Sequence, residues 1–113
     1  MNNLNAAEIF KALSDENRII ILKLLNSKEM NAAQLLAELD ITQPTLSHHT
    51  KILCESGLVT SRKEGKWTYY SISEETASYA LLTLSEILKT TQTEGQTKIP
   101  LETVKADLPS HLL

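Results

Sequence analysis

Apolar positions recur at helical spacing along most of the chain, and this pattern predicts a largely helical protein. Over residues 4–13 the apolar side chains share one face of a helix. They are Ala6, Ile9, Phe10 and Leu13. A second helix, over residues 16–26, can be capped by Ser14 or Asp15 and is apolar almost all round its middle. Such a helix is expected at the centre of a domain.

A third helix is predicted over residues 31–39. Asn31 can cap it, and Gln34, three residues further on, can reach back to form a capping box. Its buried face is supplied by leucines: Leu35, Leu36 and Leu39.

The fourth predicted helix is unusually polar. Thr42 caps it, Pro44 lies in its first turn, where the missing N–H has no helical partner anyway, and Gly57 ends it. One face carries Leu46, Thr50 and Leu53. The Thr50 hydroxyl can bond back to the carbonyl four residues earlier. The other positions are crowded with polar side chains: Gln43, Thr45, Ser47, His48, His49 and Lys51.

The hydrophobic period then changes to two over residues 58–73, which predicts a β-hairpin with Glu64-Gly65 as its turn. We expect one set of alternating side chains to face the core: Val59, Tyr70 and Ile72. The hairpin aromatic residues, Trp67 and Tyr69 with Tyr70, could stack on unpaired bases, but packing against the helices explains them better.

A last helix is predicted over residues 74–90, and its apolar seam exceeds what a small monomer needs. The seam consists of Ala77, Leu81, Leu84 and Leu88. It suggests a partner helix from a second copy of the chain. The polar, proline-containing remainder indicates a folded domain over residues 1–92 and a flexible tail over residues 93–113.

This order of elements predicts a mainly α (α+β) winged helix-turn-helix with five helices and a two-stranded wing. Its expected chemistry is binding to double-stranded DNA. Glutamine suits adenine edges, and serine and threonine are less selective. Arg62, Lys63 and Lys66 near the hairpin tip can reach phosphates or a minor groove. Two copies would read a pseudo-palindrome.

The net charge of −3 alone argues mildly against a nucleic-acid partner. Residues 41–72, however, carry a net charge of +2, which concentrates positive charge on the proposed DNA-binding segment. No apolar run is long enough to span a bilayer, and residues 1–14 do not resemble a signal peptide. We therefore expect a cytoplasmic protein without membrane contact.

The motifs "FKALSDENRIIIL" and "ELDITQPTLSHHTKILCESGLVTSRKEGKWTYYSI" resemble the ArsR/SmtB family of bacterial transcriptional repressors over about residues 5–90. The resemblance implies a homodimer joined by its first and last helices, which blocks a promoter until an inducer binds. The DNA-reading positions would be Thr42, Gln43, Thr45, Ser47 and His48, with Lys51 beside them. His49 either joins these positions or is partly buried against the neighbouring helix. The dimer interface would include Ile9, Phe10, Ala77, Leu81, Leu84 and Leu88.

Many family members bind soft metals through a Cys-x-Cys pair at the start of the third helix. Here Asn31 and Ala33 stand at those positions, and neither can bind a soft metal there. A second family site uses Asp, His and Glu on the last helix, but residues 74–90 contain no histidine. We therefore expect no metal site and no cofactor, and the inducer is not identified.

The sequence favours three other functions less. A winged-helix module could bind only proteins, although the intact helix and positive wing argue against this. Cys54 could be a thiol switch, yet Glu55 and the helix C-terminus both disfavour a thiolate. An enzyme would need a nucleophile–base pair or a metal site, and no spacing here suggests one.

Overall fold

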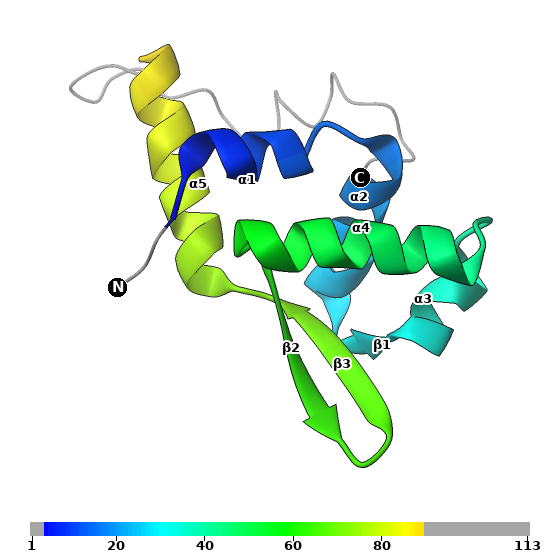
Figure 1. Cartoon of the computed structure of the whole chain (residues 1–113). Helices are drawn as coiled ribbons and strands as arrows, with labels where there is room; N and C mark the ends of the chain where they lie inside the picture. Colours follow the sequence, from blue (N-terminus) through cyan, green and yellow to red (C-terminus); the bar gives the residue numbers. More distant parts are fainter. Residues whose placement is uncertain (1–3, 90–113) are drawn as a thin grey trace. The chain divides into compact units, whose positions relative to one another are not determined.

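The computed structural model describes residues 4–89, which contain five helices and three strands. In chain order the elements are α1 (Ala6–Ala12), α2 (Glu16–Ser27), β1 (Met30–Asn31), α3 (Ala32–Glu38), α4 (Gln43–Ser56), β2 (Val59–Glu64), β3 (Trp67–Ile72) and α5 (Glu74–Leu88). The predicted mainly helical, winged helix-turn-helix order is confirmed (Figure 1). The tail expected over residues 93–113 lies outside the described residues, as does Thr90.

The chain divides into two units, one ending at Thr83 and the other beginning at Leu84 within α5. The first unit holds α1 to α4, all three strands and the first turns of α5. Its largest fully buried side chains come from four helices: Ile9, Ile21, Leu35, Leu46 and Leu53. Ile9 was expected at a dimer interface. That prediction is wrong, because Ile9 is fully buried in the core of its own chain.

Side-chain caps fix where four of the helices, α1 to α4, begin. Asp15, not Ser14, caps α2 by accepting hydrogen bonds from the backbone N–H groups of Asn17 and Arg18. Asn31 and Gln34 form the predicted capping box, in which each side chain accepts from the other's backbone N–H at 2.9 and 2.8 Å. Capping by these side chains satisfies N–H groups that have no partner inside the helix.

The sheet has three strands in the order β1-β3-β2, one more than predicted. In β1, Met30 pairs with Tyr70 and Asn31 with Tyr69. A strand of two residues shows no alternation, so the sequence pattern could not reveal it. The sheet therefore joins the wing, defined here as the β2–β3 hairpin, directly to the residues that begin α3.

The hairpin turn is one residue further along than predicted. Glu64 pairs with Trp67, so Gly65 and Lys66 form the turn. Gly65 has a φ of 64°, whereas the φ of Lys66 is not positive. Glycine at the first central position with positive φ matches a type II′ turn, whose twist suits a hairpin.

α4 ends at Gly57, as predicted, and glycine is required there for two reasons. Its φ of 91° lies in the left-handed region. A Cβ at this position would also lie only 3.2 Å from Thr76 Oγ1 and 3.3 Å from Leu4 Cδ2. Gly57 thus lets the start of α5 pack closely against the end of α4.

Candidate nucleic-acid interface

α4 is strongly two-sided. Leu46, Thr50 and Leu53 are buried, which confirms the predicted apolar face. Thr50 donates its hydroxyl hydrogen bond to the Ser47 carbonyl, three residues back rather than four, at 3.2 Å. Six of the polar residues on this helix and its cap are exposed: Thr42, Gln43, Thr45, Ser47, His48 and Lys51. This helix can therefore present amides, hydroxyls, an imidazole and an ammonium group to a groove.

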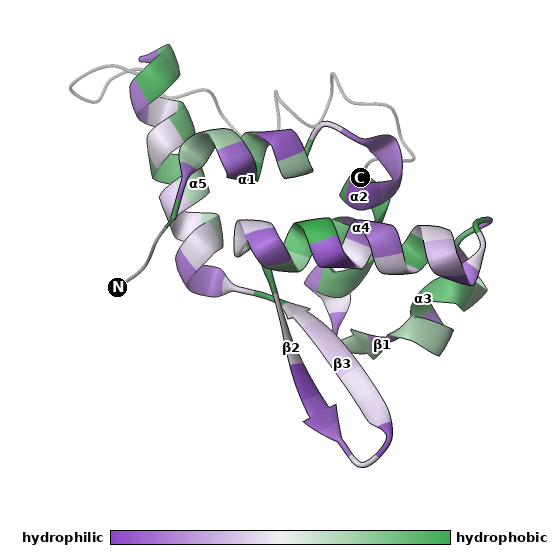
Figure 2. Ribbon diagram, in the orientation of Figure 1, coloured by the Kyte–Doolittle hydropathy of each residue, from purple (hydrophilic) through white to green (hydrophobic). Residues whose placement is uncertain are grey.

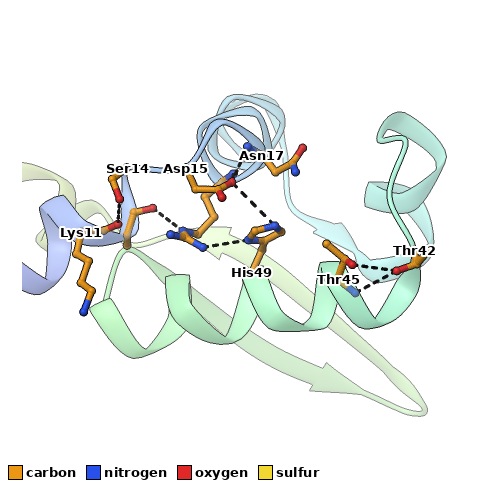
Figure 3. Close-up of polar contacts among 9 residues, drawn as sticks. Lys11, Ser14, Asp15, Asn17, Thr42, Thr45 and His49 are labelled. Carbon is orange, nitrogen blue, oxygen red and sulfur yellow. Dashed lines mark hydrogen bonds and ion pairs between the residues drawn. The ribbon is translucent and has the colours of Figure 1, made fainter.

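The N-terminal end of α4 is held by its cap. Thr42 Oγ1 accepts from the Thr45 backbone N–H at 3.4 Å and donates to Thr45 Oγ1 at 3.0 Å (Figure 3). Both hydroxyl side chains remain exposed. A helix N-terminus carries positive dipole charge and N–H groups without intrahelical partners, which favours phosphate nearby.

Of the two roles expected for His49, the structure contradicts DNA reading and confirms burial against a neighbouring helix. Its side chain is buried, at 5% exposure, and points toward α2 (Figure 3). His49 Nδ1 lies 3.1 Å from Arg18 Nη1. Because the guanidinium can only donate, Nδ1 must accept, so the neutral ring carries its proton on Nε2. That nitrogen lies 3.9 Å from Asp15 Oδ1.

The His49 contact anchors α4 to α1 and α2. Arg18 is itself buried and donates from Nε to the Ala12 carbonyl at 2.8 Å. Burial lowers the pKa of His49, although Asp15 opposes this effect. A signal was present in the sequence: His49 lies three residues after Leu46 and four before Leu53, the spacing of one helical face.

The wing carries exposed cations on a hydrophilic strand (Figure 2). Lys63 and Lys66 are exposed, and Lys66 Nζ lies 5.5 Å from the centroid of the Trp67 ring. Trp67 is 44% exposed, so the expectation that it packs against the helices is wrong. Tyr70 does pack against the core, as expected.

Arg62 is exposed but already bonded to carboxylates. It donates from Nε and Nη2 to Glu29, both at 2.8 Å, and from Nη1 to Glu64 at 2.7 Å. These hydrogen bonds raise the pKa of Arg62, and the Arg62 contact lowers the pKa of Glu29. Sequence reasoning missed Glu29, which lies in the segment before β1.

Asn31 and Ala33, which stand where some family members have thiolates, have other roles here. Asn31 is 8% exposed, and its side-chain oxygen is used in the capping box. Ala33 offers only a methyl group. Within residues 4–89, no three histidine, cysteine, aspartate or glutamate side chains gather in an arrangement that could hold a metal.

Cys54 is half-buried on α4. Burial raises the pKa of its thiol, and the Glu55 carboxylate raises it further. Both effects favour the unreactive thiol over the thiolate.

No helix among residues 4–89 is long and apolar enough to cross a membrane.

Comparison with known proteins identifies the family in which this architecture occurs. Residues 15–61 match the family model described as bacterial regulatory protein, arsR family. An uncharacterised HTH-type transcriptional regulator of Methanocaldococcus jannaschii is 42% identical over 83 residues, covering 73% of this chain and 93% of that protein. The arsenical resistance operon repressor of Escherichia coli is 36% identical over 97 residues, covering 85% of this chain and 83% of the repressor.

A solved structure shows the same fold. The ArsR-like transcriptional regulator from Rhodococcus sp. RHA1 superposes with a TM-score of 0.67 at 32% identity, covering 73% of this chain and 77% of that one. The matched span in sequence contains α2, α3, α4 and the start of the wing. The chain therefore belongs to the ArsR family of bacterial regulatory proteins, which are winged-helix, DNA-binding transcriptional regulators.

Proposed function

We propose that this regulator is a repressor that binds a pseudo-palindromic operator as a homodimer in the cytoplasm. The observation that carries the proposal is the two-sided α4, whose apolar face is buried while its polar face is exposed. α4 would enter the major groove and read base edges, while the wing would contact the adjacent backbone. The contact residues would be Thr42, Gln43, Thr45, Ser47, His48, Lys51, Lys63 and Lys66.

Fluorescence anisotropy with the promoter region of its own gene and with random duplex tests this proposal. Ser47→Ala should weaken operator binding more than random-duplex binding, because a hydroxyl at a base edge contributes only to the correct sequence. Lys66→Ala should weaken both similarly, because a phosphate contact carries no sequence information. Equal affinity for operator and random duplex would contradict sequence-specific binding.

The dimer would use apolar surface on α5 together with Phe10 of α1. Leu81 and Leu82 are 70% and 67% exposed in the single chain. Ala77 lies on the same helix, and Leu84 and Leu88 continue its apolar sequence in the second unit. Exposed leucines in such number are unfavourable in water unless a partner covers them.

Sedimentation analysis tests the dimer. Leu81→Glu should shift the protein toward monomer and reduce operator affinity, since two linked half-sites would no longer be bound together. Glu86→Gln, which changes an exposed polar position of the same helix, is the control and should leave the dimer intact. A wild-type monomer at micromolar concentration would contradict the proposal. We also propose that residues 1–92 are sufficient for dimerisation and operator binding.

The signal that releases this repressor is proposed not to be a soft metal bound at α3. The capping box occupies Asn31, and the Cys54 thiol is disfavoured as a thiolate. Titration of the protein–DNA complex with arsenite, cadmium or zinc should leave the operator bound. Release at nearly one metal ion per chain would contradict this.

A further inference from the structure

A continuous row of side chains crosses the three strands and joins the wing to α3. Arg62 of β2 pairs with Tyr69 of β3, and Tyr69 pairs with Asn31 of β1. Residues directly opposite each other in antiparallel strands share a face of the sheet. The Arg62 guanidinium carbon accordingly lies 4.8 Å from the centroid of the Tyr69 ring. At the end of the row, Asn31 caps α3.

Glu29 closes this row with two parallel hydrogen bonds. Its two carboxylate oxygens accept from Nε and Nη2 of Arg62, both at 2.8 Å. Arg62 and Glu29 are 33 residues apart in sequence. Glu29 is one residue from Met30, where β1 begins, so the contact ties the middle of β2 to the chain segment that leads into α3.

The same bonds leave Arg62 poorly suited to bind phosphate. Bidentate binding of a phosphate uses the fork of parallel N–H groups that Glu29 already occupies. Glu64 accepts from Nη1 at 2.7 Å, so two carboxylates surround one guanidinium and the group carries a net negative charge. Lys63 and Lys66 are exposed and have no carboxylate within salt-bridge distance among the contacts of residues 4–89.

We propose that Glu29 and Arg62 are positioning residues of the DNA interface, which hold the wing against the start of α3 without contacting phosphate. This inference rests on the proposed contact of the wing with DNA. It reassigns Arg62, which was expected to contact phosphate, and adds Glu29, which carries the wrong charge for a DNA contact. Lys63 and Lys66 then make the phosphate contacts of the wing.

The salt dependence of operator binding separates positioning from phosphate contact. Each phosphate contact contributes about 0.9 to the slope of log affinity against log salt, measured by anisotropy between about 50 and 200 mM salt. Lys63→Gln should reduce the slope by about that amount per wing. Arg62→Gln should weaken operator binding about two- to fivefold per wing, within the range of a well-formed exposed ion pair, and leave the slope unchanged.

Glu29→Gln gives a test in which the two explanations differ in sign. Loss of a negative charge near DNA should tighten binding if only electrostatics matters. If Glu29 positions the wing, binding should weaken about two- to fivefold per wing. Glu38→Gln is the matched control, because it removes the same charge from an exposed position of α3. It should not weaken binding.

A charge exchange tests the pair itself. In a Glu64→Gln background, which removes the second carboxylate, Glu29→Arg combined with Arg62→Glu should recover most of the affinity that either change alone loses. Hydrogen exchange gives a readout without DNA, since Glu29→Gln should speed exchange of the backbone amides of the wing. The exchange of α4 amides should not change.

The outcomes are distinguishable. A slope reduced by Arg62→Gln as much as by Lys63→Gln, or tighter binding by Glu29→Gln, overturns the inference while leaving the wing in contact with DNA. Unchanged affinity and slope in the variants Lys63→Gln, Lys66→Gln and Arg62→Gln would mean that the wing does not bind DNA. That result would overturn both the proposed wing contact and the inference.

Discussion

α4 and the wing adjoin in sequence and fold, yet different contacts hold them in place. On its buried side, α4 is held by Leu46 and Leu53, which are at most 1% exposed, and by the buried His49–Arg18 contact. The wing has one buried position, Val59, at its base, and beyond it β2 is exposed as far as Glu64. The wing is held there by strand pairing and by exposed ion pairs.

This difference separates stability from binding. Buried apolar contacts contribute most of the free energy of unfolding, whereas exposed ion pairs contribute little to it. Changes on the buried side of α4 should therefore lower the free energy of unfolding, whereas changes in the wing should alter DNA affinity with little effect on stability.

The largest effect should follow Leu53→Ala. Leu53 is fully buried among the core side chains, so the change removes apolar contacts and leaves a cavity. We expect a loss of about 2–5 kcal/mol in the free energy of unfolding, measured by urea denaturation followed by circular dichroism. Trp67→Ala, at the exposed end of β3, should cost clearly less. Equal losses would show that packing holds the wing as firmly as α4.

The same substitution at two arginines should separate the regions further. Arg18→Gln leaves the buried Ala12 carbonyl and the His49 ring without their donor, so we expect a loss of about 1–3 kcal/mol in the free energy of unfolding. Arg62→Gln should leave the unfolding midpoint nearly unchanged and act on DNA affinity instead. A thermal or urea unfolding curve for each variant measures this, and a large loss for Arg62→Gln would contradict the comparison.

The sequence predicted α4 better than it predicted the wing. The caps Asn31 and Thr42, the Gly57 terminus and the buried face of α4 depend on residues within a few positions of one another, and the sequence predicted them correctly. These are short-range rules of helix formation. His49 obeyed the same spacing rule, which pointed to burial against a neighbouring helix, whereas the family resemblance placed it beside the DNA-reading positions.

The wing depended on contacts between distant residues, which a single sequence does not display. Pairing of Asn31 with Tyr69 and the Glu29–Arg62 contact both join segments more than 30 residues apart. The turn was misplaced by one residue because Gly65 can occupy either central position of a hairpin turn. Only Val59, Tyr70 and Ile72 followed from alternation.

The smallest predicted effect is a pH dependence of stability, and it involves one side chain on the buried side of α4. Several groups face His49: Arg18 and Asp15 from α2 and its cap, and His48 from α4. Burial lowers the pKa of His49 in the folded state below its usual value of 6.5. The unfolded chain therefore binds this proton more readily. Stability from this group is complete above about pH 6.5 and is lost as the pH falls through the lowered folded pKa.

Urea denaturation at about pH 7.5 and about pH 5 measures this dependence, because the unfolded chain takes up the His49 proton at a higher pH than the folded protein does. Burial raises the pKa of Asp15, but hydrogen bonds from the backbone N–H groups of Arg18 and Asn17 hold it below 3.8. The contribution of Asp15 to stability is therefore lost only at lower pH. His49→Asn should remove most of the loss between the two conditions, since an amide oxygen near the Nδ1 position can still accept from Arg18 but does not titrate. His48→Asn is the matched control on the exposed side and should keep the loss. Stability that rises on acidification, or a loss abolished by His48→Asn instead, would show that the contact beneath α4 does not depend on a neutral His49.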